Sequence, residues 1–170
     1  MGFLDILAQY AQGGSVASAA HAGLHFDELA AHAAPDAVGG GIAAALRGDS
    51  GESFAASVEQ LFGSSDADQK AGLLSHLIQA VEPAALSSVA GGALARFVPR
   101  VAAGTSLAPG DAETVSPSQA AELAAVAERH DPGVIERVGG FYAQHPTLVK
   151  ALGAAALTIA MNHIADRTRT

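Results

Sequence analysis

Residues 146–165, PTLVKALGAAALTIAMNHIA, decide the fold of this chain. Five polar residues interrupt an otherwise apolar or small run, and on a helical wheel four of them fall within a stripe roughly 120° wide. A helix of this kind needs neighbours other than water around most of its circumference. It is therefore either the central helix of a bundle or a membrane-seeking segment. The polar residues are Thr147, Lys150, Thr158 and Asn162 in the stripe, and His163 apart from it.

The choice between bundle and membrane depends on those polar residues. A helix of this length, about 30 Å, matches the thickness of a bilayer core. Lys150, Asn162 and His163 are costly in lipid, however, and alanine contributes little to membrane insertion. Small residues recur four apart at 151/155 and 156/160, which permits close helix packing in lipid or in protein. The sequence therefore favours a buried central helix over a membrane span.

The large apolar residues of this helix and of the segment before it are the expected packing or interaction contacts. They are Leu148, Leu152, Leu157, Ile159 and Ile164, with Phe141 and Tyr142.

Apolar stripes with helical spacing recur along the rest of the chain, and no segment has the pattern of a strand. Helix starts are also marked: Pro35 suits a first helical position, and Ser116-Pro117-Ser118-Gln119 is a capping box. We therefore expect an all-α protein, a bundle of about seven or eight short helices around the apolar C-terminal helix. The clearest stripes are Phe54, Val58, Leu61 and Phe62; Leu73, Leu74, Leu77, Ile78 and Val81; and Val134, Ile135, Val138, Phe141 and Tyr142.

Composition divides the chain into three parts. Residues 1–98 form an N-terminal helical region, and residues 117–170 a C-terminal unit of three helices packed on the rest. Between them, residues 99–116 are rich in Pro, Gly, Ser and Thr, which predicts a linker or exposed loop.

Gly39-Gly40-Gly41 lies inside a predicted helix, where each glycine costs about 1 kcal/mol of helix stability relative to alanine. Such a run indicates either a very close backbone neighbour or a broken helix.

The charge balance argues against nucleic-acid binding. The 170 residues carry a net charge of −8, and the residues up to Val98 hold ten acids against three bases. No basic stripe is present to neutralise phosphates. Charged residues make up only 15% of the chain, against about 25% in a typical protein. Few charges and many small residues suggest surfaces covered by another subunit, a lipid face or a hydrophobic ligand.

Cysteine is absent, which excludes disulfides, thiolate zinc sites and cysteine nucleophiles. The opening residues lack a basic segment and include Asp5, so they do not resemble a secretory signal. We expect a cytoplasmic protein. The chain also has no Gly-x-Ser-x-Gly elbow and no phosphate-binding loop, and we expect it to be non-enzymatic.

Histidines form the one pattern with metal-ligand character. If a single helix runs through His21, His25, Glu28 and His32, their side chains share one face, and these are ligand types that zinc or non-haem iron prefers. Gly23 could break that helix. The alternative is a solvated polar face, and no other cofactor is expected.

Three segments resemble the YidB-like family of small bacterial helical proteins. They are Met1-Gly-Phe-Leu-Asp-Ile-Leu, the segment 54–77 with Gln60-Leu-Phe-Gly63 at its centre, and Ala90-Gly91-Gly92-Ala93-Leu94. The C-terminal residues from Gly140 to Lys150 and beyond resemble an extension found in uncharacterised bacterial relatives. The resemblance implies an all-helical bacterial fold with no established activity, and it supplies no functional residues.

Three functions remain open. The leading prediction is an interaction or assembly protein, or an accessory subunit, that associates with itself or with another bacterial protein. The second is a carrier or binder of a hydrophobic small molecule, such as a lipid or quinone, held between helices around the apolar rod. The third is a metal or haem site at the N-terminal histidines.

Overall fold

A computed structural model describes residues 2–12, 19–49 and 53–169 of the chain. All regular structure within these residues is helical, which confirms the all-α prediction. The contacts divide the chain into two compact units. Unit 1 combines Met1–Glu52 with Gly139–Thr170, and unit 2 is Ser53–Val138. This division differs from the three parts expected from composition, because both ends of the chain fold into the same unit.

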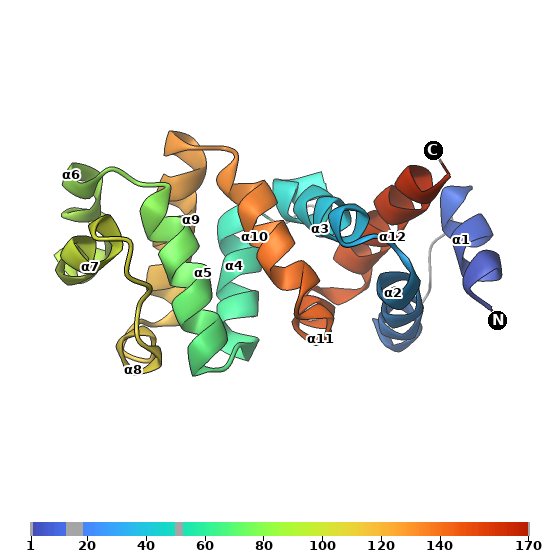
Figure 1. Cartoon of the computed structure of the whole chain (residues 1–170), viewed down its shortest axis with the longest axis horizontal. Helices are drawn as coiled ribbons and strands as arrows, with labels where there is room; N and C mark the ends of the chain where they lie inside the picture. The colour runs from blue at the N-terminus through green and yellow to red at the C-terminus, as the bar shows by residue number, and fades with distance from the viewer. Residues whose placement is uncertain (1, 13–18, 50–52, 170) are drawn as a thin grey trace. The chain divides into compact units, whose positions relative to one another are not determined.

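Unit 1 is built from N-terminal and C-terminal helices that pack on one another (Figure 1). A π turn, Ala45–Asp49, follows its third helix, and a 3₁₀ turn, Lys150–Leu152, precedes its last. The helix α10 contributes its C-terminal half to this unit. The helices are α1 (Phe3–Ala11), α2 (Ala19–His32), α3 (Pro35–Ala44), α10 (Val134–Ala143), α11 (Pro146–Val149) and α12 (Gly153–Thr168).

The C-terminal helix α12 is the centre of unit 1. It contacts α1, α2 and α3, and Figure 1 shows all three beside it. Among the described residues, one segment, Pro146–Thr168, is long and apolar enough to cross a membrane, and 44% of its apolar window is buried inside the protein. The side chains that α12 buries are Ala156, Leu157, Ala160, Met161, Ile164 and Ala165.

Glycines let α3 approach its neighbours at backbone distance. A Cβ atom on Gly41 would lie 2.6 Å from the carbonyl oxygen of Ala160 in α12. A Cβ on Gly39 would lie 3.3 Å from the Cα of Gly140 in α10. The glycine run therefore permits a close approach of neighbouring backbones. It does not break the helix, because α3 continues from Pro35 to Ala44.

The predicted rod over residues 146–165 is interrupted near its start. Gly153 has φ +86° and ψ 172°, a conformation that is essentially restricted to glycine. The chain therefore forms the short α11 and a 3₁₀ turn before α12 begins. The wheel pattern could not reveal this interruption, because a single glycine among alanines leaves the apolar spacing intact.

Unit 2 packs α4 along α9 and packs α5 against α8 and α9. The predicted stripes of α4 and α5 are buried. The predicted capping box at Ser116 is present: the backbone N–H of Gln119 donates to Ser116 Oγ, and the backbone N–H of Ser116 donates to Gln119 Oε1. Besides the N-terminal half of α10, the helices are α4 (Phe54–Ser64), α5 (Ala67–Gln79), α6 (Pro83–Leu86), α7 (Val98–Ala102), α8 (Pro109–Ala112) and α9 (Pro117–His130), with 3₁₀ turns at Val89–Gly92 and Ala95–Phe97.

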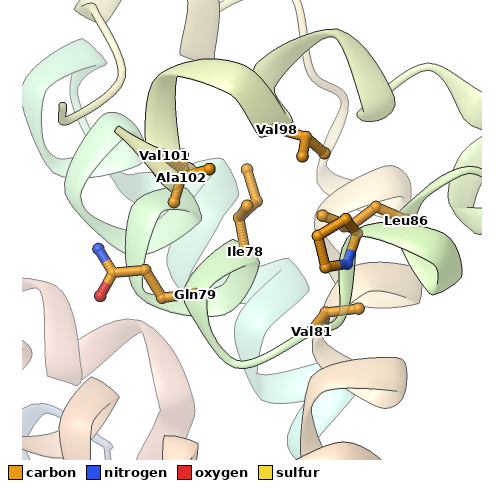
Figure 2. Close-up of a pocket in the computed structure, with 8 residues that line it drawn as sticks. Ile78, Gln79, Val81, Leu86, Val98, Val101 and Ala102 are labelled. Atoms are coloured by element: carbon orange, nitrogen blue, oxygen red, sulfur yellow. The ribbon is translucent and has the colours of Figure 1, made fainter. Parts of the chain in front are cut away.

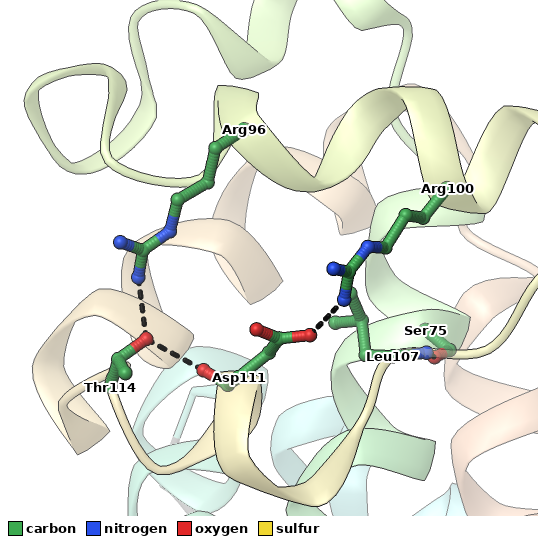
Figure 3. A network of polar contacts seen from close by, with 6 residues as sticks. All are labelled: Ser75, Arg96, Arg100, Leu107, Asp111 and Thr114. Carbon is green, nitrogen blue, oxygen red and sulfur yellow. Dashed lines mark hydrogen bonds and ion pairs between the residues drawn. The ribbon is translucent and has the colours of Figure 1, made fainter.

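The segment 99–116, expected as a linker or exposed loop, is exposed over most of its length but packs on unit 2 through three side chains. It contains most of α7 and all of α8, and the side chains of Leu107, Ala112 and Val115 are buried. The backbone N–H of Leu107 donates a 3.2 Å hydrogen bond to Ser75 Oγ in α5 (Figure 3). The polar residues of this segment lie on its outer side. Its three apolar residues, spaced along the segment, attach it to the core.

Candidate functional site

The first helix carries apolar residues on two faces. Phe3, Ile6 and Tyr10 recur at i, i+3 and i+7, which places them on one side of α1. A second set at i, i+3, i+4 and i+7 lies on the neighbouring face, about 120° around the helix, and it consists of Leu4, Leu7, Ala8 and Ala11. A helix of nine residues at the edge of a unit can bury only one such stripe against its own chain.

The inner stripe attaches α1 to the rest of unit 1. Ile6 and Tyr10 are buried, and the Tyr10 hydroxyl forms a 3.2 Å hydrogen bond with His25 Nδ1 in α2. Burial raises the pKa of Tyr10 above its usual value, so the hydroxyl stays protonated. The ring of Phe3 lies 5.1 Å from the ring of His32, centre to centre. The orientation of α1 is therefore fixed by specific contacts.

The outer stripe is only partly covered by the described residues: Leu4 and Ala8 are exposed, while Leu7 and Ala11 are partly buried. Leu4 is 74% exposed. The four residues of this stripe, together with Gln12 and Arg169 from the end of the chain, line a shallow cavity of about 300 Å³. We call this set the α1 outer face: Leu4, Leu7, Ala8, Ala11, Gln12 and Arg169. It joins an apolar strip to a cationic side chain at one end.

A second exposed leucine lies on α2. Leu24 is 65% exposed and borders a separate cavity of about 340 Å³ with Ile6, His25 and Glu28. This cavity has a carboxylate and an imidazole in its wall, so it is more polar than the α1 outer face. Among the described residues, Leu4 and Leu24 are the large apolar side chains that are exposed.

The predicted metal ligands lie on one continuous helix but do not form a metal site. The helix α2 runs through Gly23 without a break, and the side chain of Lys150 covers that glycine, 3.3 Å from the position of a Cβ. His21 and His32 are eleven residues apart, which is about 16 Å along the helix axis. No group of three or more His, Cys, Asp or Glu in the described part of the chain could hold a metal ion.

Two of these histidines have other partners. His25 hydrogen-bonds to the Tyr10 hydroxyl. His32 Nδ1 lies 2.9 Å from the carbonyl oxygen of Glu28, while the Glu28 carboxylate lies 3.9 Å from the same nitrogen. His21 is exposed. His25 and His32 therefore serve local contacts, and the pattern within α2 could not indicate the partner of His25 because Tyr10 lies in α1.

The residues predicted as packing contacts occupy two kinds of position. Leu152, Leu157, Ile164 and Tyr142 are buried in unit 1. Leu148, Ile159 and Phe141 are only partly buried. Phe141 packs against the rings of Tyr142 and His145, at centroid distances of 5.1 and 5.2 Å. These side chains mainly form the core of unit 1, so they are poor candidates for contacts with another protein.

His163 packs against α3, and one of its ring nitrogens is buried without a hydrogen bond. Its Nε2 atom lies 3.3 Å from the position of a Cβ on Gly40 and has no hydrogen-bond partner among the described residues. Asn162 Oδ1 is likewise buried and unpartnered there. Burial lowers the pKa of His163, and the positive charges of Arg167 and Arg47 lower it further, against the opposing effect of Asp166. Burial and the two arginines therefore disfavour the protonated form of this imidazole.

Comparison with protein-family models, curated proteins and solved structures finds no significant match to this chain. The resemblance to the YidB-like family stays a prediction.

Proposed function

We propose that this chain is a non-enzymatic interaction protein that associates with a second copy of itself through the α1 outer face. The exposure of Leu4 carries the proposal, because an apolar stripe at i, i+3, i+4 and i+7 is the pattern by which helices pack on helices. An exposed leucine alone is ordinary. Here it continues into three further small or apolar residues and a cavity.

A second copy is the favoured partner because of the charges at the two ends of α1. Asp5 lies in the first turn of α1, and Arg169 lines the cavity together with Ala11 and Gln12 from the other end. In a two-fold arrangement with antiparallel α1 helices, the first turn of one copy faces the last turn of its partner. Asp5 of each copy then approaches Arg169 of the other, which favours this orientation over a parallel one.

The small size of the surface predicts a weak, reversible dimer. Stable complexes bury about 1,200–2,000 Å² in total, and a single nine-residue helix from each copy contributes less. Burying an exposed leucine contributes about 1.5 kcal/mol. A symmetric dimer buries two copies of Leu4, one from each chain. Removing both therefore costs about 3 kcal/mol, which raises the dissociation constant roughly a hundredfold.

Sedimentation equilibrium over a wide range of protein concentrations tests this proposal. The wild type is expected to show a concentration-dependent monomer–dimer equilibrium, and Leu4→Ala is expected to shift it about a hundredfold toward monomer. Leu24→Ala is the matched control, because it removes the other exposed leucine, which belongs to a different surface. A monomer at every concentration, or equal effects of the two substitutions, would contradict the proposal.

The charge pair gives a second, independent test. Asp5→Arg and Arg169→Asp each place like charges together across the proposed dimer, so each weakens it. The double variant restores opposite charges and is expected to recover part of the lost affinity. A double variant no stronger than either single variant would remove the argument for the antiparallel orientation. Association with a different protein would then have to be considered.

A further inference from the structure

Unit 2 contains an open cavity lined by seven hydrocarbon side chains and one amide side chain. It has a volume of about 230 Å³ and lies where the end of α5 meets α6 and α7. Figure 2 shows hydrocarbon side chains from these segments directed around a common space. Ile78, Val81 and Leu86 are buried and form its inner part. The remaining lining residues are Gln79, Pro83, Val98, Val101 and Ala102.

The volume of this cavity suits a small molecule. An engineered apolar cavity of about 150 Å³ binds benzene, which has six carbons. A cavity of about 230 Å³ therefore has room for a molecule of roughly eight carbons.

The chemistry of the lining favours a neutral ligand. Among the lining residues, all of which are described, none is charged, and Gln79 supplies the one polar side chain. Glu82 is exposed and lies in the chain between the lining residues Val81 and Pro83, so an anionic head group is repelled there. Arg100, next to Val101, is engaged by the carboxylate of Asp111. An amide offers both a donor and an acceptor, which suits a hydroxyl or carbonyl group.

Polar contacts hold the α7 wall of the cavity in place. Arg100 pairs with Asp111 in α8, Arg96 donates to Thr114 Oγ1, and Thr114 Oγ1 donates to the carbonyl oxygen of Asp111 (Figure 3). Leu107 is fixed to α5 through Ser75. These contacts fix the residues on both sides of α7. The cavity is therefore formed in the absence of a ligand, as is usual for binding sites.

We propose that this cavity binds a neutral aliphatic molecule with a chain of about eight carbons, whose polar end emerges beside Gln79. The cavity lies within unit 2, so the proposal is independent of the α1 outer face. The sequence suggested a hydrophobic ligand around the C-terminal rod, whereas this site belongs to α5, α6 and α7.

Titration with a series of straight-chain 1-alkanols from butanol to dodecanol, each below its aqueous solubility, tests the proposal. Binding is followed by methyl NMR of the full chain. The signals of Ile78, Val98 and Val101 are expected to shift saturably, while those of Ile42, in unit 1, stay in place. Affinity is expected to rise up to about fourfold per added methylene while the chain still fits. It should level off beyond about eight carbons, once the cavity is full.

Two substitutions at neighbouring alanines separate the cavity from the surface around it. Ala102 lines the cavity and Ala103 does not, and both are exposed. Ala102→Phe is expected to fill the cavity and to weaken octanol binding at least tenfold. Ala103→Phe adds the same ring outside the cavity and is expected to bind octanol like the wild type. Thermal unfolding of both variants checks that each is folded.

Three results would overturn the proposal. The first is the absence of saturable shifts at Ile78 and Val101. The second is an affinity that rises with chain length without levelling off, which indicates nonspecific partition. The third is equal octanol binding by folded Ala102→Phe and Ala103→Phe. Failure of these tests would leave the dimer proposal unaffected, because the dimer is measured without alkanol and on different residues.

Discussion

Two adjacent glycines in α10 should respond in opposite ways to the same substitution. A Cβ on Gly139 would lie 2.6 Å from the carbonyl oxygen of Gly39 and 2.9 Å from the backbone nitrogen of Ala43. A Cβ on Gly140 would meet nothing within 4 Å. Both lie within the helix, so alanine gains about 1 kcal/mol of helix propensity at either position. The neighbours of Gly139 are backbone atoms, which cannot rotate aside.

The two variants therefore differ by the cost of overpacking alone. Gly140→Ala is expected to raise the free energy of unfolding by about 1 kcal/mol. Gly139→Ala gains the same amount but forces α3 and α10 apart, which typically costs about 1–3 kcal/mol. The gap between the two variants should therefore be about 1–3 kcal/mol, with Gly139→Ala the less stable.

Tyrosine fluorescence during urea unfolding measures this gap in the right part of the molecule. The chain has two tyrosines and no tryptophan. Tyr10 and Tyr142 are both buried in unit 1, so the signal follows the unit that contains the α3–α10 contact. Equal unfolding free energies for the two variants, within 0.5 kcal/mol, would refute the close approach of α3 and α10. A destabilised Gly140→Ala would do the same.

Two further predictions concern pH and the segment 99–116. Because the folded state lowers the pKa of His163, the unfolded chain binds more protons below about pH 6.5, so the free energy of unfolding should fall as the pH drops through that value. His163→Gln should flatten this dependence when unit 1 is followed by tyrosine fluorescence between pH 7.5 and 5.5, and an unchanged slope would show that another group is responsible. Leu107→Ala should cost about 2–4 kcal/mol in urea unfolding followed by circular dichroism, because the side chain is buried against unit 2; a cost below 0.5 kcal/mol would be the behaviour of an exposed linker.

Local signals in the sequence predicted most of the helices and little of their assembly. The stripe from Phe54 to Phe62 and the capping box at Ser116 depend on residues within two turns of one another, and both are present. The composition of residues 99–116 misled because turn-forming residues outnumber apolar ones there. Leu107 is one apolar residue among polar neighbours, yet its burial and its hydrogen bond to Ser75 decide where the segment lies.

The histidines of α2 show why a shared helix face is a weak predictor of a metal site. Convergence on one ion requires that ligands also lie within one or two turns along the axis, which His21 and His32 do not. It further requires that their nitrogens be free of other partners, and Tyr10 in α1 already bonds to His25. That partner is fifteen residues away in sequence, so no periodicity within α2 could indicate it.

The α1 outer face was the part of the candidate site nearest to prediction from sequence. Nine residues contain two apolar stripes, at 3, 6, 10 and at 4, 7, 8, 11, and one edge helix has a single inner side. The sequence could thus have shown that one stripe stays uncovered by its own chain. Which stripe faces outward depends on the contacts of Tyr10 with His25 and of Phe3 with His32, since those polar and aromatic partners orient α1 and leave Leu4 exposed.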